Sequence, residues 1–199
     1  MNIPVPYLDQ TNAAPTGCES VSSVMLLQYL GYAIDIERFI GEYLDCGIFE
    51  RRGNEWWGSD PRERFVGDPH KPEALGCYAP VIVNALEKIV GEQYQIINET
   101  GCEIDTLCKT YIDDGMPVIL WCSIDMKPTI NGPWYRLIPS GEPFMWVSNE
   151  HCLLLTGYDD TSYICNDPWH NHGVVHYPKK TLWERHRELG MQAVALRKI

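Results

Sequence analysis

The chain has 199 residues, of which 45% are hydrophobic and 22% charged, and its formal net charge is −11. This composition is typical of a globular protein with a sizeable core, and the negative charge argues against nucleic acid, whose phosphates it would repel. No apolar run approaches the roughly 18 residues that a membrane-spanning helix needs. We therefore expect one domain over residues 1–199, with no membrane span.

Helical periodicity dominates the first half of the chain. A largely buried helix is predicted over residues 19–30, with Gly31 as its C-terminal cap, and Asp35 can cap a second helix over 36–44. Apolar residues also recur at helical spacing over 82–90 and 104–112, and Gly115 and Pro117 end the last of these helices. The sequence therefore predicts that residues 1–115 are mainly helical.

The second half has the pattern of short strands with turn residues between them. These strands are predicted over residues 118–124, 152–156, 163–166, 174–177 and 192–196, with one helix over 182–189. Residues 157–161 join the second and third strands as a hairpin. A helical first half packed on an antiparallel sheet in residues 116–199 gives an α+β fold.

Two long segments, 45–76 and 125–150, carry no clear pattern of helix or strand. They contain four of the seven tryptophans, which are Trp56, Trp57, Trp134 and Trp146. Because long loops inside a compact protein are often functional, we expect ordered loops that wall a cleft. The alternative is that these tryptophans only fix the loops to the core.

The chain has eight cysteines and no C-x-x-C pair, so neither a disulfide framework nor a zinc ribbon is indicated. Most should be small buried hydrophobic residues. Cys18 differs, because it begins the first predicted helix directly after Gly17. Unpaired backbone N–H groups and the helix dipole would stabilise a thiolate there. Gly17 would let a substrate carbonyl approach the backbone.

A base and its orienting group are predicted on the hairpin. His151 opens the apolar strand that follows the second long segment, and Asp167 ends the next strand. Antiparallel pairing brings the start of one strand beside the end of the next, so these two residues should be neighbours. Gln10, on the N-terminal loop before Cys18, would supply a side-chain amide to an oxyanion hole together with the Cys18 backbone N–H.

The chain carries Gln-x7-Cys, then His151, then Asn-Asp-Pro, in that order. This order resembles the one found in the C39-like cysteine peptidases, a branch of the papain-like superfamily. The resemblance runs through the whole chain. The motifs that carry it are Ile3-Pro4-Val5-Pro6-Tyr7, Gln10, Thr16-Gly17-Cys18-Glu19-Ser20, Phe65-Val66-Gly67-Asp68-Pro69, Gly115-Met116-Pro117-Val118, Glu150-His151, Gly157-Tyr158-Asp159 and Asn166-Asp167-Pro168. Glu19 after the nucleophile, and the absence of an ATPase or membrane portion, depart from the members that cut leader peptides at transporters.

The resemblance implies a papain-like cysteine peptidase fold with Cys18 as nucleophile and His151 as base. Asp167 would orient the base, and Gln10 would help to bind the oxyanion. The predicted substrate is a peptide or another amide. Candidate substrate-binding residues are Gly17, Trp57, Trp146 and Glu150. We expect no cofactor.

Three alternatives remain open at the level of sequence. His170, His172 and His176 have a spacing that suggests a metal site, but Pro168, Asn171 and Gly173 place a turn there, so we expect no metal. The same thiol chemistry could serve a non-peptide amide or an acyl transfer. A non-catalytic module that binds peptides or glycans on the same fold is the third possibility.

The N-terminal residues Met1–Pro6 have neither the basic region nor the hydrophobic core of a signal peptide. The sequence as written therefore predicts a cytoplasmic protein. An extracellular location would follow if a leader had been trimmed. The oligomeric state is left open.

Overall fold

The computed structural model describes all residues 1–199 and contains two β-sheets with five α-helices. The larger sheet has six strands in the order β3-β10-β4-β7-β8-β9. These are β3 (Tyr94–Asn98), β4 (Val118–Ser123), β7 (Glu150–Tyr158), β8 (Ser162–Asp167), β9 (Gly173–Pro178) and β10 (Ala193–Lys198). Every strand pairs antiparallel with its neighbours. The predicted α+β class and the predicted hairpin between β7 and β8 are confirmed.

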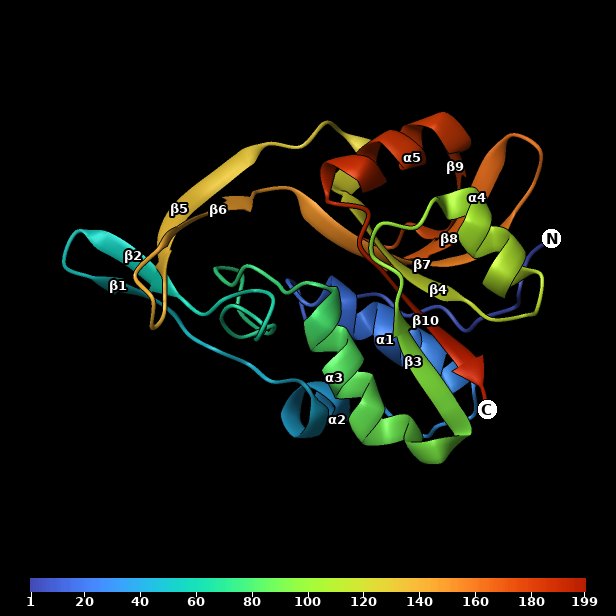
Figure 1. Cartoon of the computed structure of the whole chain (residues 1–199), viewed down its shortest axis with the longest axis horizontal. Coiled ribbons are helices and arrows are strands. Elements are labelled where there is room, and N and C mark those ends of the chain that lie inside the picture. Colours follow the sequence, from blue (N-terminus) through green and yellow to red (C-terminus); the bar gives the residue numbers. More distant parts are fainter.

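Helices cover both faces of this sheet (Figure 1). On one face lie α1 (Cys18–Tyr29) and α3 (Ala79–Val90), and α2 (Ile36–Arg38) with a π-helical turn over Phe39–Tyr43 lies beyond them. On the other face lie α5 (Lys179–Glu188) and α4 (Ile104–Leu107), the latter extended by a π-helical turn over Cys108–Ile112. The helices predicted over 19–30, 36–44, 82–90, 104–112 and 182–189 are all present, with shifted ends.

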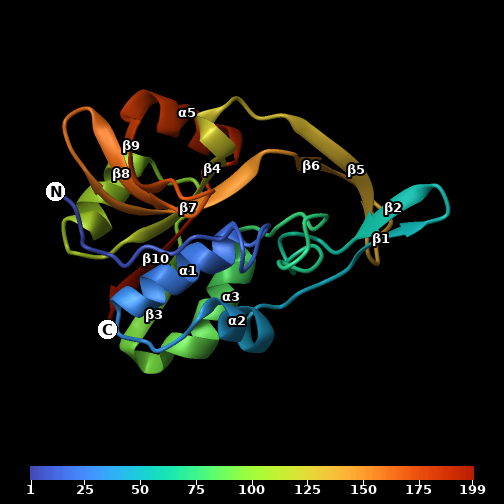
Figure 2. The ribbon, with the colours of Figure 1, turned by 180° about the vertical axis from the view of Figure 1, so that it is seen from behind.

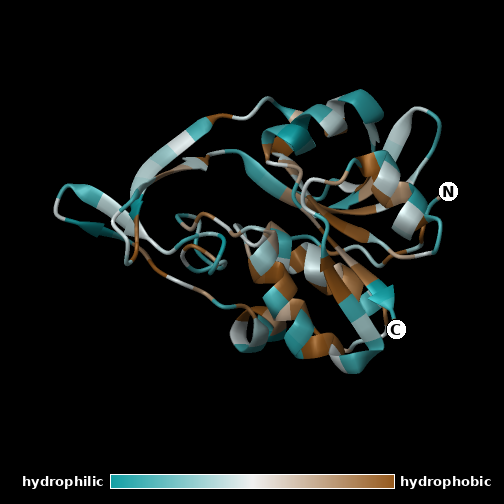
Figure 3. Cartoon of the chain, in the orientation of Figure 1, coloured by the Kyte–Doolittle hydropathy of each residue, from teal (hydrophilic) through white to brown (hydrophobic).

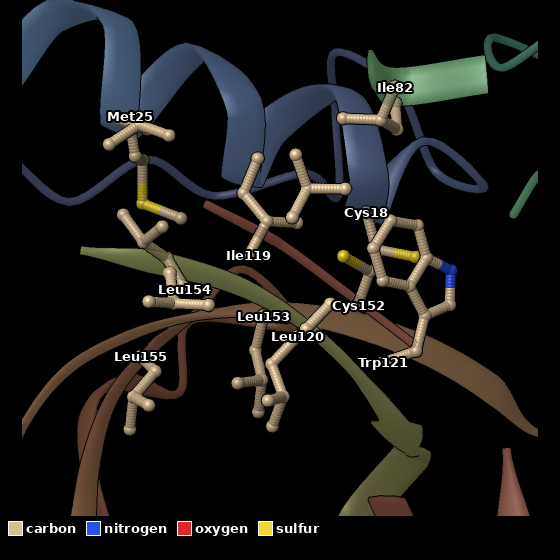
Figure 4. Packing of buried hydrophobic residues seen from close by; sticks show 14 of the residues in the cluster. Cys18, Met25, Ile82, Ile119, Leu120, Trp121, Cys152, Leu153, Leu154 and Leu155 are labelled. Atoms are coloured by element: carbon tan, nitrogen blue, oxygen red, sulfur yellow. The ribbon is translucent and has the colours of Figure 1, made fainter. Parts of the chain in front are cut away.

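The core lies between α1 and the two central strands. Figure 4 shows that Cys152 and Leu154 of β7 face α1, whereas Leu153 and Leu155 face the opposite side of the sheet. This is the alternation that a strand imposes when both faces are covered. The brown segments in Figure 3 mark the same layer, along the inner sides of α1 and α3 and the middle of the sheet. The packing of α1 against β4 and β7 brings the Cys18 sulfur, at the helix start, within 4.8 Å of a carboxyl oxygen of Glu150, the first residue of β7.

The two segments without a predicted pattern form the second sheet together. Its strands are β1 (Phe49–Arg52), β2 (Glu55–Gly58), β5 (Asn131–Leu137) and β6 (Pro143–Val147), in that order. The hairpin β1–β2 joins the hairpin β5–β6 through a parallel pairing of β2 with β5. Both views place this sheet at the opposite end of the molecule from the two termini (Figures 1 and 2).

Residues 1–115 are mainly helical as expected, but they also contain strands at two places that the sequence did not predict. The hairpin β1–β2 lies in this half, and β3 adds an edge strand to the six-stranded sheet by pairing with β10. Both additions depend on partners in the C-terminal half, so local periodicity does not reveal them. None of the helices has the length and hydrophobicity that a membrane-spanning helix requires.

Candidate active site

Cys18 is the first residue of α1, with Gly17 as the N-cap. A Cβ on Gly17 would lie 2.8 Å from the Cβ of Ala14, so only glycine fits this close turn. Cys18 is buried, with 5% of its surface exposed, and it lines a pocket of 420 Å³. The predicted position of the cysteine at a helix start is confirmed.

His151 and Asp167 meet as the hairpin predicts. His151 Nε2 lies 2.8 Å from Asp167 Oδ1, and both side chains are buried. This contact leaves Nδ1 as the ring nitrogen available to the pocket, which His151 lines together with Cys18. The carboxylate of Asp167 therefore fixes the orientation of the imidazole, because a buried charged acceptor holds its donor strongly.

Asp167 is itself held by three further donors that the sequence did not single out. The Trp169 backbone N–H donates to Oδ1 at 2.9 Å, the Tyr177 hydroxyl donates to Oδ2, and His172 Nδ1 lies 3.3 Å from Oδ2. Burial alone would raise the pKa of Asp167, but the charge and hydrogen bond of His151 and the hydroxyl of Tyr177 outweigh it and lower the pKa. Asp167 thus stays ionised.

Gln10 is buried and lines the same pocket as Cys18 and His151. Its Nε2 donates to the carbonyl of Pro15 at 2.8 Å, and its backbone N–H donates to the carbonyl of Pro168 at 3.0 Å. The second bond ties the N-terminal loop to the residue after Asp167. An amide nitrogen carries two hydrogens, so one remains for a ligand in the pocket.

The other candidate residues are distributed differently from the prediction. Trp146 of β6 and Glu150 of β7 line the pocket, and Trp146 stacks on Tyr78 with ring centroids 5.4 Å apart. Trp57 lies on β2 under the Arg52 guanidinium and does not line the pocket, and Gly17 does not line it either. Trp134 and Trp56 are 63% and 41% exposed on the second sheet. Of the four tryptophans, only Trp146 walls the pocket.

Sequence reasoning missed part of the pocket wall. The segment Pro72–Leu75, in the first unassigned stretch, forms one wall, and Trp169 and His170 form another. The Trp169 ring meets the His151 ring edge to face at 6.0 Å between centroids. An aromatic residue directly after Asn166-Asp167-Pro168 is the signal that could have pointed to Trp169.

The predicted electrostatics of Cys18 are wrong in the resting structure. The helix start was expected to favour a thiolate, but burial raises the pKa of Cys18 well above its usual value, and Glu19 and Glu150 raise it further. The Cys18 sulfur donates to Glu19 Oε2 at 3.3 Å. The resting sulfur is therefore a thiol beside two carboxyl groups.

His170, His172 and His176 do not come together as a metal site. His172 contacts Asp167, and His176 Nδ1 lies 3.5 Å from Asp159 Oδ2. His170 lines the pocket. The close group of sulfur and carboxyl atoms at the site is instead Cys18, Glu19 and Glu150, within 4.8 Å of one another.

Comparison with known proteins assigns the chain to a family. The sequence model described as "Peptidase_C39 like family" matches residues 2–194. The chain belongs to the C39-like peptidase family. Of the seven cysteines other than Cys18, five are buried, in agreement with the expectation that most are small buried hydrophobic residues.

Relatives of this C39-like chain agree with the assignment. The chain is 27% identical over 184 residues to the uncharacterized protein YvpB of Bacillus subtilis, covering 92% of this chain and 69% of YvpB. A candidate C39-like peptidase of known structure from Bacillus anthracis superposes with a TM-score of 0.84 at 25% identity, covering 98% of this chain and 96% of the other. The predicted family and papain-like fold are thus confirmed.

More distant structures share the fold. The peptidase domain of Streptococcus ComA, a bifunctional ABC transporter, matches with a TM-score of 0.54 at 15% identity over 98% of this chain and 97% of that domain. A double-glycine-motif protease from a transporter, solved with its leader peptide, matches with a TM-score of 0.56 at 15% identity, covering 100% of this chain and 94% of the other.

Proposed function

We propose that this C39-like protein is a cysteine peptidase that cleaves an amide bond through Cys18, His151 and Asp167. The observation that carries the proposal is the buried 2.8 Å contact between His151 Nε2 and Asp167 Oδ1. It commits one ring nitrogen to the carboxylate and leaves the other for the pocket that Cys18 shares. A nucleophile, a base and a group that orients the base are the parts that covalent acyl transfer requires.

The reaction proceeds in two halves. His151 Nδ1 takes the proton of the Cys18 thiol, and the sulfur forms a bond to the carbonyl carbon of the substrate. The resulting oxyanion accepts hydrogen bonds from Gln10 and from backbone N–H groups at the start of α1. The carbon–nitrogen bond then breaks, and His151 donates its proton to the leaving amine. Water, deprotonated by His151, cleaves the thioester and restores the thiol.

The pocket walls favour an uncharged or positively charged ligand. Its apolar lining includes Trp146, Trp169 and Leu75, and its acidic lining comes from Glu73 and Glu150, with no lysine or arginine. A peptide segment with apolar side chains suits such a wall. The complex of the related transporter protease with its leader peptide supports a peptide substrate for this fold.

The test is covalent capture with a small library of peptides that carry a carbon electrophile in place of the scissile amide. We expect one adduct per chain, on Cys18, measured by intact-mass and peptide mass spectrometry. Cys18→Ala should abolish capture, and His151→Ala should slow it by about 10²–10⁴ because the general base is lost.

Cys46 supplies the control because it is the exposed cysteine. Labelling of Cys46 at the rate of Cys18 would mean ordinary thiol reactivity and would contradict the proposal. A lack of capture by every peptide, with the protein folded, would favour the binding-module alternative. To distinguish hydrolysis from acyl transfer, an amine nucleophile is added to the reaction and the products are analysed. Hydrolysis gives a carboxylic acid, and acyl transfer gives a new amide.

A further inference from the structure

The carboxyl group of Glu19 bridges the nucleophile and the opposite wall of the site. Its Oε2 accepts from the Cys18 sulfur at 3.3 Å, and its Oε1 accepts from the backbone N–H of Cys77 at 2.6 Å. Glu19 lies on the first turn of α1 and is fully buried. A charged side chain in this position is costly unless something compensates it, so its place beside the sulfur needs an explanation.

Glu150 provides a second carboxyl group against the first. It is 7% exposed, its Oε1 has no hydrogen-bond partner, and it has an oxygen within 4.8 Å of the Cys18 sulfur and a Glu19 oxygen. It opens β7 directly before His151 and lines the pocket. Two buried carboxyl groups this close cannot both ionise cheaply, because each negative charge disfavours the other.

The backbone packs tightly over this pair of carboxyl groups. A Cβ added to Gly76 would lie 2.7 Å from Glu19 Oε1, 3.1 Å from Glu150 Oε2 and 3.1 Å from Trp146 Cζ2. Gly76 also has a φ of +148°, which side chains rarely adopt. The backbone at Gly76 therefore covers one side of the pair, whereas Glu150 also borders the pocket.

The titratable groups whose charges interact with the pair come from four parts of the chain. They are Cys18 of α1, Cys46 before β1, Cys77 and Tyr78 before α3, and His151 and Cys152 of β7. His151 is the single member that can carry a positive charge, and its Nε2 is already committed to Asp167. No lysine or arginine is among these groups, so a retained proton is the compensation that the chain itself can supply.

We propose that Glu19 and Glu150 carry one proton between them at neutral pH, and that Glu19 is a further catalytic residue that controls whether Cys18 is a thiol or a thiolate. The catalytic part of this inference rests on the proposed function. Ionised Glu19 accepts the S–H hydrogen and keeps the sulfur neutral. Protonated Glu19 reverses the bond, because its O–H then donates to a thiolate. Transfer of the sulfur proton to His151 is therefore favoured when Glu19 is neutral.

The direction of the titrations agrees with this geometry. Burial raises the pKa of Glu19 to about 7, against the opposing hydrogen bond from Cys77. Burial and the charge of Glu19 raise the pKa of Glu150 well above its usual value. Glu19 accepts a hydrogen bond at each of its oxygens, whereas Glu150 Oε1 accepts none, so Glu150 is the group that keeps its proton at neutral pH and Glu19 is the group that changes state.

The experiment compares two substitutions that remove the same carboxyl group, one beside the Cys18 sulfur and one on the exposed surface. The rate of Cys18 alkylation by iodoacetamide is measured from pH 5.5 to 9 by mass spectrometry, on the full chain. Glu19→Gln removes the negative charge and offers an N–H to the sulfur, so the rate should rise about tenfold near pH 8, one unit above the Glu19 pKa of about 7, and by less at lower pH. Glu87→Gln is the control, because Glu87 lies exposed on α3, and its rate should stay within about threefold of the wild type over the same pH range.

A second measurement keeps the inference testable if a variant is poorly folded. Side-chain carboxyl signals of ¹³C-labelled glutamate in the wild-type protein are followed by NMR as a function of pH. Two glutamates should titrate far above the usual value of about 4.3. The inference fails if no glutamate does so, if Glu19→Gln leaves the alkylation profile unchanged, or if a chelator shifts the wild-type profile, since a cation would then compensate the carboxyl groups.

Failure of this inference and failure of the proposed function are distinguishable, because alkylation requires no substrate turnover. If the electrophilic peptides label Cys18 and Glu19→Gln has no effect on alkylation, the peptidase proposal stands and the role of Glu19 falls. If Glu19→Gln accelerates alkylation and no peptide labels Cys18, the peptidase proposal falls, and with it the catalytic part of this inference.

Discussion

Asp167 is the residue on which most hydrogen bonds of the site converge. It accepts from His151, Tyr177 and the Trp169 backbone, all from positions near or after the hairpin. Such a carboxylate fixes a base more firmly than an asparagine would, because its hydrogen bonds are charge-assisted. The orientation of His151 therefore depends on the electrostatics of one buried side chain.

Replacing Asp167 by Asn should lower kcat by about 10²–10⁴, because the imidazole loses the acceptor that fixes its tautomer. The substrate is the peptide identified by capture, with its scissile amide restored. Hydrogen bonds to a charged group contribute about 1.5–3 kcal/mol each, so unfolding by urea should also become easier. The low pKa of Asp167 stabilises the fold above its unfolded value of about 3.9, and this contribution is lost as the pH falls through the folded value.

Asp160→Asn is the matched control for this prediction, because Asp160 lies exposed in the hairpin turn. Its turnover and its stability at low pH should follow the wild type. Equal turnover for the two variants would contradict the assigned role of Asp167. The measurements are steady-state kinetics with the peptide found by capture, and urea unfolding at several pH values.

Gln10 is expected to act mainly on the chemical step. Gln10→Ala should lower kcat by about 10²–10³ with little change in KM, because an oxyanion donor acts chiefly in the transition state. Gln28→Ala is the control, since its Nε2 also donates to a backbone carbonyl, that of Ile34, but at the far end of α1. An unchanged kcat for the Gln10 variant would remove it from the oxyanion hole.

At the scale of elements, β7 joins the site to the core. Its first residues, Glu150 and His151, line the pocket, and the following residues pack between α1 and the helices on the opposite face. Near the C-terminal end of β7, the N-terminal segment runs antiparallel to the strand, and Asn2 forms a β-bridge with Gly157. The strand is irregular between Leu155 and Gly157, where the register with β8 shifts.

Gly157→Ala should destabilise the protein by about 1–3 kcal/mol, because overpacking forces the backbone to move. A Cβ there would lie 2.2 Å from the carbonyl oxygen of Met1 and 2.8 Å from Asn2 Cα. Gly41→Ala is the control, since nothing lies within 4 Å of its Cβ position. Chemical denaturation of both variants measures the difference, and equal midpoints would show that the N-terminal segment yields freely.

At the scale of the whole molecule, the two buried carboxyl groups and Asp167 have opposite effects on stability. A carboxyl group whose pKa is raised on folding stabilises the fold fully below its unfolded pKa, and this contribution is lost as the pH rises towards the folded value. For Glu19 the window runs from about 4.3 in the unfolded chain to about 7 in the fold.

The free energy of unfolding of the wild type should therefore fall between about pH 4.3 and about pH 7, relative to the double variant Glu19→Gln, Glu150→Gln. In the double variant neither side chain titrates, so this part of the slope should vanish. Urea unfolding followed by tryptophan fluorescence at intervals of pH measures both curves. Parallel curves for the two proteins would show that the carboxyl groups ionise normally in the fold.

The sequence reveals the elements whose determinants are local. The helices follow from apolar residues at helical spacing, and the strands that pair with a chain neighbour follow from their apolar runs and turns. The meeting of His151 with Asp167 also follows from one hairpin, because the register of adjacent strands is set locally. The order of motifs identifies the family, which the match over residues 2–194 confirms.

The sequence does not reveal the second sheet or the state of Cys18, which depend on partners distant in the chain. β2 pairs with β5 across a long separation, so the pairing leaves no local signal in either segment. Glu150 reaches Glu19 only after β7 packs against α1, and that burial reverses the expected effect of the helix start on the Cys18 pKa. The sequence alone determined the helices, the hairpin and a cysteine at a helix start. Tertiary structure decided the charge around that cysteine, because desolvation and neighbouring charges depend on packing.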